Sequence, residues 1–359
     1  MTIEETRRQR LAQQVGELKL DALLVTSLHN VRYLTGFTGS SANVLLYRDG
    51  PAVLFTDPRY TVQSKQQVNC AVRVAKGPLT KSVMKEVGRK RVSRVGFEPD
   101  HINVARMEGL TRALPSKSRL QPVEEGLIAK LRMVKDEGEI ALIRAAVALN
   151  SQALESALKR FKPGMTETAL AAEIDYQSRK LGADGPAFDT IVAAGERAAL
   201  PHAHPGPAKI GPGMVLIDMG AFKDGYASDM TRMVHTGPAD SVYKNAYNAV
   251  LEAQLAAIAA VRPGTTAASV DRAARKILQQ RGLEKEFVHS TGHGLGLEIH
   301  EAPRLGKSDK TKLEPGMAIT IEPGVYIEGW GGIRIEDTVL VTETGCEVLT
   351  PTSKNLIEI

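Results

Sequence analysis

Cysteine is scarce in this sequence. Its 359 residues include only Cys70 and Cys346, and two thiols so far apart indicate a reducing compartment rather than a disulfide framework. A run of about eighteen apolar residues, which a membrane-spanning helix needs, is also absent. The first twenty residues mix charges with sparse apolar residues and lack the apolar core of a secretory signal. We therefore expect a cytoplasmic protein.

Aromatic residues are few as well, at 4% of the chain. The formal net charge is +5, but the densest basic run, 89–91 with Arg94, has no aromatic residues among its charges. Such a run is typical of a solvated surface, so we expect neither a nucleic-acid nor a membrane partner. The apolar fraction of 43% is that of an ordinary globular protein, and the length predicts about two domains.

Short apolar segments alternate with helical patterns in about the first 120 residues. Residues 21–27 have strand length and composition, and 43–57 have the pattern of a hairpin. This alternation predicts a small α/β domain with no gathering of metal ligands, suited to a structural or oligomerisation role. Residues 127–136 have the character of a crossing between domains, which places the boundaries at 1–126 and 127–359.

The second domain contains an internal repeat. KPGMT at 162–166 is echoed by RPGTT at 262–266, and each lies between two predicted helices. GPGMVLIDMG at 211–220 is echoed by EPGMAITIEPG at 314–324, and each opens a predicted hairpin that carries acids. Self-similarity of this kind predicts two halves of similar build that meet at the acids.

The first acid-bearing hairpin runs over residues 215–231. Asp218 and Asp229 are centred between Lys223 and Asp224, inside a predicted turn at residues 223–225, which predicts that they lie directly opposite each other on one face. Two like charges in that position are destabilising unless a cation lies between them. The pair therefore predicts a metal.

The second hairpin repeats this design. Glu322 ends the apolar run 319–321, Glu336 follows the returning strand, and the two are centred on Gly329 in a glycine-rich turn. They too should face each other. The alternative is four unrelated surface acids, but two such pairs beside a group of histidines favour a shared site around two cations.

Five of the eight histidines lie close to these hairpins in sequence, namely His202, His204, His289, His293 and His300. The last three fall within FVHSTGHGLGLEIHEAPRL, residues 287–305. The spacing of His289 and His293 suggests a zincin helix, but the glycines make a helix unlikely there and HExxH is missing. The glycines also resemble a dinucleotide loop, which no flanking strand and helix support. Glycine here lets backbone and imidazole approach a crowded cation site.

Four carboxylates and one imidazole would carry about four negative charges, which two divalent cations neutralise. Oxygen-rich ligation with one nitrogen favours Mn²⁺, with Co²⁺, Fe²⁺ or Zn²⁺ as alternatives, over a structural zinc site. Two such cations can share a bridging hydroxide and polarise a carbonyl. Metal-assisted hydrolysis is the predicted reaction class.

These motifs resemble the M24 "pita-bread" metallopeptidases, a family that includes methionine aminopeptidase, aminopeptidase P and prolidase. The signatures resemble its proline-specific branch, Xaa-Pro aminopeptidases and Xaa-Pro dipeptidases: IDMG, DMTR, STGHGLGLEIHEAP, IEPG and GIRIEDT. NVRYLTGFTGS at 30–40 and TDPRY at 56–60 resemble the creatinase-type N-terminal module of the same branch. The resemblance spans nearly the whole chain. It implies an α+β fold in which a pita-bread domain with a pseudo-twofold repeat follows a smaller α/β creatinase-type domain.

The resemblance also implies five metal ligands, namely Asp218, Asp229, His293, Glu322 and Glu336. Asp218 would chelate one ion, and Asp229 and Glu336 would bridge both. His293 and Glu322 would complete the shell of the second ion, and Glu322 would also shuttle a proton between the nucleophilic water and the leaving nitrogen.

Further roles follow from the same resemblance. His300 would donate to the carbonyl oxygen as charge develops there, and His202 would position the imino-acid side of the substrate. His289 would line the substrate site, and Arg304 would contact the free carboxylate of a dipeptide.

The implied function is hydrolysis of the Xaa-Pro bond at the N-terminus of peptides or dipeptides, by a homodimer. Arg304 favours dipeptides, but sequence patterns leave the substrate length open. The alternatives are a metal-free creatinase-like hydrolase and a non-catalytic pita-bread peptide-binding module. Both lack the full set of acids, and this chain retains it.

Overall fold

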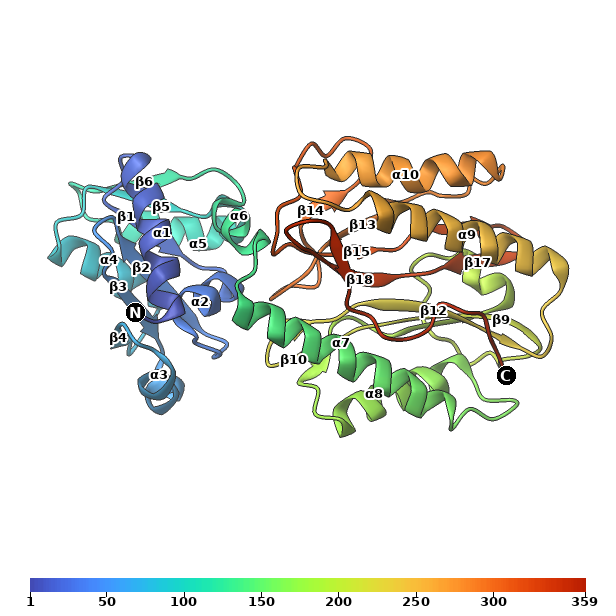
Figure 1. Cartoon of the computed structure of the whole chain (residues 1–359). Helices are drawn as coiled ribbons and strands as arrows, with labels where there is room; N and C mark the ends of the chain where they lie inside the picture. Colours follow the sequence, from blue (N-terminus) through green and yellow to red (C-terminus); the bar gives the residue numbers. More distant parts are fainter. The chain divides into compact units, whose positions relative to one another are not determined.

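The computed structural model describes residues 1–359, which form two compact units, Met1–Arg132 and Met133–Ile359. The division falls inside α6 (Leu127–Met133), near its end, whereas the sequence places the boundary just before this helix. None of the helices combines the length and the apolar composition that crossing a membrane requires. Figure 1 labels the helices and strands of each unit.

The first unit is built on a six-stranded mixed sheet. The hairpin expected over 43–57 is present as the antiparallel strands β2 (Ala42–Tyr47) and β3 (Ala52–Thr56), and β1 (Ala22–Val25) pairs in parallel with β5 (Arg94–Phe97). In sheet order the strands are β4 (Ala71–Val74), β3 (Ala52–Thr56), β2 (Ala42–Tyr47), β1 (Ala22–Val25), β5 (Arg94–Phe97) and β6 (Arg119–Pro122). The helices are α1 (Ile3–Glu17), α2 (Leu28–Thr35), α3 (Thr61–Gln67), α4 (Leu79–Arg89) and α5 (Val104–Ala113), with 3-10 turns η1 (Pro58–Tyr60) and η2 (Pro99–His101).

Apolar side chains of the sheet and of two helices make the core of this unit. Val83 and Val87 of α4 and Leu110 of α5 pack with Leu24 and Phe55 of the strands, and all five are buried. The burial of β1 and β3 is continuous rather than alternating, because helices cover both faces of the sheet. The predicted α/β character is confirmed.

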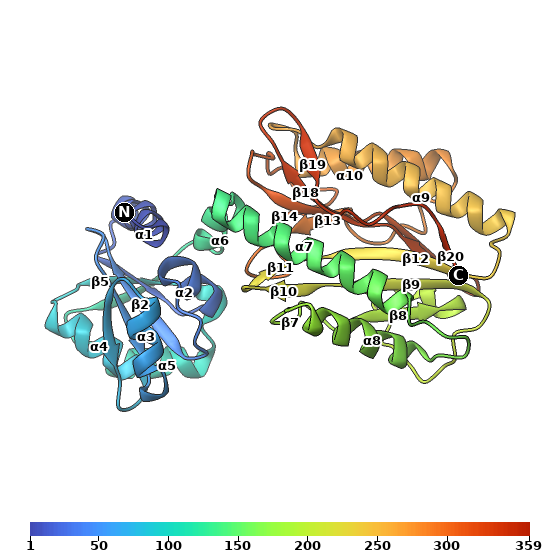
Figure 2. The same ribbon diagram turned by 60° about the horizontal axis from the view of Figure 1, so that its bottom comes forward.

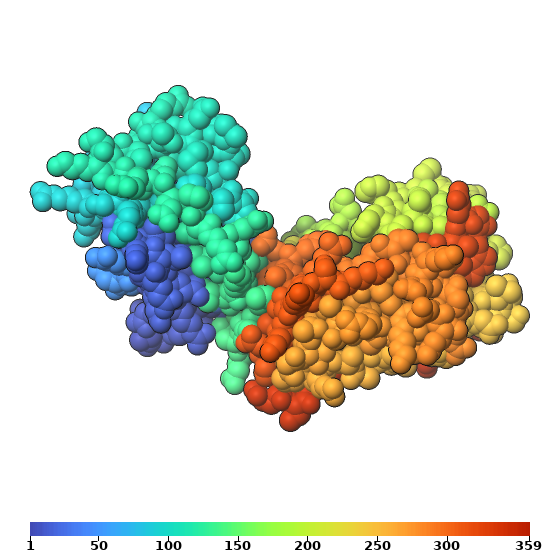
Figure 3. Space-filling model, turned by 90° about the horizontal axis from the view of Figure 1, so that it is seen from above, coloured from blue at the N-terminus to red at the C-terminus, as the bar shows by residue number.

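The second unit contains two pairs of helices with strands between them. Figures 1 and 2 show α9 and α10 on one side of the strands and α7 and α8 on the other. In Figure 3, α9 and α10 (orange) cover much of the face of this unit that is in view. The helices are α7 (Glu137–Leu158), α8 (Glu167–Lys180), α9 (Ser241–Ala260) and α10 (Ala267–Gln280), with a 3-10 turn η3 (Gly195–Ala199).

The strands of the second unit fall into sheets that follow its two halves. The first half contributes β7 (Gly185–Pro186), β8 (Ile191–Ala194), β9 (Gly213–Met219), β10 (Ala221–Lys223), β11 (Tyr226–Ala227) and β12 (Met230–Thr236). The second half contributes β13 (Gly292–Gly294), β14 (Glu301–Leu305), β15 (Ala318–Ile321), β16 (Gly324–Ile327), β17 (Gly331–Arg334), β18 (Asp337–Val341) and β19 (Cys346–Val348). The last strand, β20 (Ile357–Glu358), returns to the first half and pairs in parallel with β12.

The predicted repeat is present in detail. Thr166 is the N-cap of α8 and Thr266 the N-cap of α10, and each side-chain oxygen accepts from the backbone N–H three residues on. The backbone of each threonine also forms an isolated antiparallel β-bridge with a lysine that precedes the hairpin of its half, Thr166 with Lys209 and Thr266 with Lys312. Equivalent local bonds therefore set the second helix of each half against the segment that leads into its acids.

Candidate metal centre

The first hairpin brings its two aspartates to one face, but not directly opposite each other. In the β9–β12 ladder Thr231 is the partner of Asp218, so the predicted pairing of Asp218 with Asp229 is wrong. The reason lies in the turn. Asp224 and Gly225 both have positive φ, 48° and 74°, and form a two-residue turn in which Lys223 pairs with Tyr226.

The error in register is two residues on one strand, which preserves the face. Asp229 lies between β11 and β12, whose pairs with β10 and β9 share one register. Side chains alternate between faces with a period of two, which sets Asp229 on the same face as Thr231, the partner of Asp218. Asp218 and Asp229 are diagonal neighbours instead of direct partners. The two carboxylates still point to the same side of the hairpin, because a register error of two residues leaves each side chain on its predicted face.

The second hairpin has the predicted register. Ile321 pairs with Asp337 on one side of a short break in the ladder, and Gly324 pairs with Arg334 on the other. Both pairs belong to one continuous register, which sets Glu322 opposite Glu336 inside the break. Because Glu322 and Glu336 lie outside the ladder, their side chains can turn toward the other acids of the cluster.

The acids of both hairpins meet at His293. Ligand atoms of Asp229, His293 and Glu336 all lie within 4.8 Å of one another. Nε2 of His293 is 3.5 Å from Oδ2 of Asp229 and 3.3 Å from Oε1 of Glu322. The five predicted ligands line one cavity of about 800 Å³: Asp218, Asp229, His293, Glu322 and Glu336.

His293 lies on a strand whose glycines allow close packing. Gly292 and Gly294 flank it in β13, and a Cβ atom on either glycine would collide with backbone of Thr320 or Ala302. The expected role of these glycines in close approach is confirmed, and no helix forms there. Nδ1 of His293 contacts the Gly294 carbonyl oxygen at 3.0 Å, so Nε2 is left to face the acids.

The other predicted site residues line the same cavity, namely His202, His289, His300 and Arg304. The rings of His293 and His300 are 4.4 Å apart, and Nε2 of His289 is 2.9 Å from the hydroxyl of Tyr326. Arg304 is exposed at the cavity edge, where its Nε donates to Oγ of Ser290. His204 lines the cavity as well.

One central residue of the site, Arg334, is not among the residues predicted from the sequence. Arg334 is buried among the acids, and its Nη2 donates to Oδ2 of Asp218 at 2.6 Å. Its Nη1 donates to the hydroxyl of Tyr326, and its Nε donates to Oγ1 of Thr231. Burial opposes its charge, but Tyr326, Asp218 and other acids outweigh that effect and raise the pKa of Arg334. Its position two residues before Glu336, on the same side of the strand, was the available signal.

The charges of the acids are not balanced by protein groups alone. Burial, followed by repulsion from Glu336 and Asp218, raises the pKa of Asp229 well above its ordinary value. Burial, followed by repulsion from Glu322 and Asp218, does the same to the pKa of Glu336. Arg334 is a single cation among four carboxylates, so further positive charge would favour the ionised cluster.

Two carboxylate oxygens of the cluster indicate where a cation could bind. Oδ1 of Asp218 and Oε1 of Glu336 are buried and accept no hydrogen bond. Buried carboxylate oxygens are almost always satisfied, and a divalent cation satisfies several at once. The backbone contact at Nδ1 of His293 is also the usual partner of a metal-binding imidazole. The residues therefore fit a divalent metal centre.

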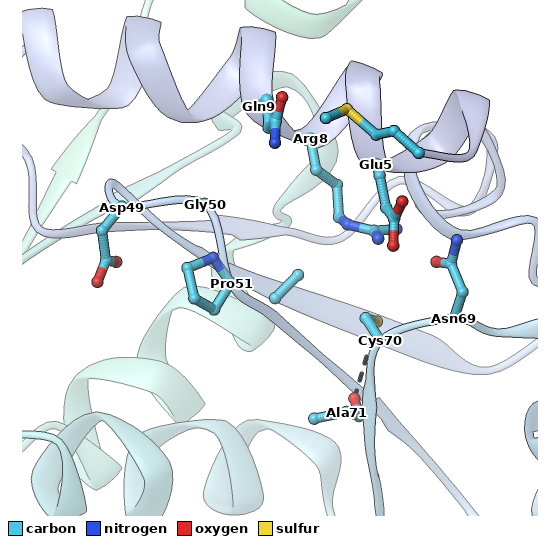
Figure 4. A pocket seen from close by; sticks show the side chains of 11 residues that line it. Glu5, Arg8, Gln9, Asp49, Gly50, Pro51, Asn69, Cys70 and Ala71 are labelled. Carbon is cyan, nitrogen blue, oxygen red and sulfur yellow. Dashed lines mark hydrogen bonds between the residues drawn. The ribbon is translucent and has the colours of Figure 1, made fainter.

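A separate cavity of about 590 Å³ lies in the first unit and has a different character. Figure 4 shows Arg8 extending from α1 toward the loop that carries Asn69 and Cys70, with Glu5 beside it. This cavity contains no histidine and no group of converging acids. The chemistry of a metal centre belongs to the cavity of the second unit.

Comparison with known proteins agrees with this site. Residues 141–343 match metallopeptidase family M24, and residues 7–134 match the creatinase/prolidase N-terminal domain. The chain belongs to metallopeptidase family M24. It is therefore a peptidase, and the family implies divalent metal ions, which the acid cluster is suited to hold. The predicted creatinase-type domain followed by a pita-bread domain is confirmed.

Relatives and solved structures within this family match over nearly the full chain. An Xaa-Pro dipeptidase of Pyrococcus horikoshii is 34% identical and is aligned over 99% of this chain and 100% of its own. The structure of an Xaa-Pro dipeptidase from Bacillus anthracis superposes with a TM-score of 0.95 at 37% identity, covering 99% of this chain and 100% of that one. An X-Pro aminopeptidase from Thermotoga maritima gives a TM-score of 0.90 at 34% identity, covering 96% and 100%.

Proposed function

We propose that this M24 peptidase hydrolyses the Xaa-Pro bond at the N-terminus of dipeptides or short peptides. The observation that carries the proposal is the convergence of the five predicted ligands and three histidines, His202, His289 and His300, on one cavity. The names of similar proteins, Xaa-Pro dipeptidase and X-Pro aminopeptidase, support the bond specificity. Both substrate lengths occur among them, so the length is decided by experiment.

Asp218, Asp229, His293, Glu322 and Glu336 would hold two divalent cations, with Asp229 and Glu336 shared between them. Mn²⁺ is the proposed ion because oxygen ligands dominate the set. When bound, the cations would make a water molecule more acidic and polarise the carbonyl group of the scissile bond.

Glu322 is the proposed proton carrier. Its burial raises the pKa of the carboxyl group, although the charges of His289 and Arg334 act in the opposite direction. Oγ1 of Thr320 donates to its Oε1 at 3.1 Å and orients the group. A carboxyl group whose pKa is shifted toward neutrality can take a proton from the attacking water and give it to the leaving nitrogen of proline.

The histidines would act on the substrate. Burial, and then the neighbouring His293, lowers the pKa of His300, which favours the neutral imidazole at physiological pH. A neutral N–H can donate to the carbonyl oxygen as negative charge develops on it. His202 and His289 would hold the imino-acid and adjoining parts of the substrate, and Arg304 would meet the free carboxylate of a dipeptide.

Product analysis tests the proposal. Metal-stripped protein is reloaded with Mn²⁺ or Co²⁺ and incubated with Ala-Pro, Ala-Pro-Ala and Ala-Ala. We expect metal-dependent release of alanine from one or both proline substrates and little from Ala-Ala. Equal rates on Ala-Ala and Ala-Pro would refute the specificity, and turnover without metal would favour a creatinase-like hydrolase. No turnover with any metal would favour a peptide-binding module. The expected homodimer stays a prediction that light scattering can test.

A further inference from the structure

Among the buried carboxylates of the second unit that lie outside the acid cluster, two occupy the second helix of each half, one on each helix. Glu167 on α8 and Asp271 on α10 have relative exposures of 0% and 1%. Each is paired with an arginine. Nε of Arg197 lies 3.0 Å from Oε2 of Glu167, and Nε of Arg275 lies 2.7 Å from Oδ2 of Asp271. Arg275 is largely buried, whereas Arg197 is partly exposed. Because ion pairs of both kinds contribute little net stability, we look for their value in what each pair holds in place.

The Asp271–Arg275 pair holds the segment that leads into β13. Nη1 and Nη2 of Arg275 donate to the carbonyl oxygens of Phe287 at 3.0 Å and of His289 at 2.5 Å. Oδ1 of Asp271 accepts from the backbone N–H of Thr291 at 3.2 Å and from its hydroxyl at 2.9 Å. One ion pair on α10 therefore fixes three alternate residues, with His289 in the middle.

The hydrogen bonds of Arg275 and Asp271 to this segment also set the position of the imidazole of His289. Its ring packs edge-on against Phe287, with centroids 5.1 Å apart, and Nε2 reaches the hydroxyl of Tyr326 on its other side. The guanidinium group of Arg275 covers the ring of Phe287 at 4.2 Å. Arg275 thus acts on both the backbone of His289 and the ring that packs against it.

The first half repeats the arrangement around His202. Oε1 of Glu167 accepts from the N–H of Ala194 at 2.8 Å, and Oε2 accepts from the N–H of Gly206 at 2.9 Å. These bonds close the loop 194–206, which carries His202, and Nη2 of Arg197 donates to the His204 carbonyl oxygen at 2.6 Å. In each half, a buried acid accepts hydrogen bonds from backbone N–H groups. The arginine paired with that acid donates to the backbone carbonyl oxygen of a histidine that lines the cavity, His204 in the first half and His289 in the second.

We propose that these two ion pairs are positioning elements. The Asp271–Arg275 pair sets the imidazole of His289 in the cavity, and the Glu167–Arg197 pair sets that of His202. No residue of either pair lines the cavity. The consequence for catalysis rests on the proposed Xaa-Pro peptidase function, in which both histidines contact substrate. Misplacing a substrate-contacting group by about 1 Å can reduce turnover efficiency by about 10².

Arg275→Lys tests the second half. Lysine keeps the positive charge opposite Asp271 but lacks the planar fork that reaches the carbonyl oxygens of Phe287 and His289 together. Arg281→Lys is the matched control, because Arg281 follows the end of α10 and its partner Glu252 is exposed. With Mn²⁺-loaded protein and Ala-Pro, we expect Arg275→Lys to raise KM roughly tenfold with little change in kcat. The control should match the wild type.

A purely structural role predicts a different result. It would lower the melting temperature and the active fraction, so kcat would fall while KM stayed constant, and that outcome would overturn the proposal. Metal content, measured by mass spectrometry, should be equal in both variants and the wild type. A lower content in Arg275→Lys alone would place the pair in support of the metal ligands instead.

A second measurement does not depend on activity. Imidazole NMR signals of ¹⁵N-histidine protein are assigned with His289→Gln and His202→Gln. We expect Arg275→Lys to shift the signals of His289 and leave those of His202 in place, and Glu167→Gln to do the reverse. Unchanged His289 signals in Arg275→Lys would overturn the positioning role. If the wild type cleaves no proline substrate, the proposed function fails while this measurement still decides the positioning role.

Discussion

Nη2 of Arg334 donates to Oδ2 of Asp218 at 2.6 Å, while the other oxygen of Asp218 is buried without a partner. The protein thus satisfies one side of this carboxylate with its own cation and leaves the other side available. Since Arg334 is surrounded by Asp218, Asp229, Glu322 and Glu336, it offsets only part of their charge. This single cation explains how the acid cluster can form in the folded chain and still favour divalent metals.

Removing that cation should destabilise the metal-free protein. Arg334→Met keeps much of the side-chain volume but leaves Asp218 without its buried partner. Breaking a buried ion pair in this way costs about 3–5 kcal/mol. Urea denaturation of metal-stripped protein should show this loss in the free energy of unfolding. Arg144→Met, which removes an exposed pair with Glu347, is the control, with an expected loss of about 0–1 kcal/mol. Equal losses in the two variants would contradict the central role of Arg334.

The acid cluster should make the effect of metal on stability depend on pH. The pKa values of Asp229 and Glu336 are raised in the folded state, so their contribution to stability is complete below their unfolded pKa values, about 4. That contribution is lost as the pH rises through the raised folded values. Bound metal removes the repulsion, so the increase in melting temperature on adding Mn²⁺ should be larger at pH 8 than at pH 5. Scanning fluorimetry measures it, and a constant increase across this range would argue against the cluster.

Asp229→Asn separates the ligand role of this carboxylate from its role in the fold. The amide has nearly the same size but no charge, so the proposed bridging ligand is lost while one source of repulsion in the cluster disappears. We expect hydrolysis of Ala-Pro to fall to the metal-stripped background with the melting temperature of the metal-free protein preserved. Turnover and metal content after reloading are the measurements. Near-normal rates in the reloaded variant would rule out a bridging role.

His300→Ala tests the stabilisation of charge on the carbonyl oxygen. Loss of a donor to a developing oxyanion lowers kcat by about 10²–10³ and leaves ground-state binding largely intact. Steady-state kinetics on Ala-Pro separates the two constants. His101→Ala, in the first unit, should leave both unchanged. A defect confined to KM would assign His300 to substrate binding instead.

Much of the fold could be predicted from local signals. The hairpin at 43–57 and the helices on either side of the PG turn at 162–166 depend on residues near in sequence, and each appears where it was predicted. The repeat was visible because its two halves share the same PG turns and hairpin openings. The pairing of β20 with β12 was not predicted, because two residues carry no periodic pattern and their partner lies far away in the chain.

The candidate site was predicted in composition but not in full geometry. Centring the first turn between Lys223 and Asp224 displaced its register by two, whereas Asp224 and Gly225 as the central pair would have given the right one. Arg334 was missed because a search for ligands selects acids and histidines, although buried acids need a cation. The pairing of Asp271 with Arg275 spans one helical turn, but its bonds to Phe287 and His289 depend on tertiary packing that no local pattern records.

The division of the proposed ligands between the two halves of the second unit has a consequence for how the molecule could be dissected. Asp218 and Asp229 precede the connection from β12 to α9, whereas His293, Glu322 and Glu336 follow it. Cleavage of the chain in that connection would yield two fragments, and neither fragment would contain enough of the proposed ligands to bind two cations. Peptidase activity should then return only on reassociation, which would make the enzyme a complementation reporter whose signal requires both fragments to be joined.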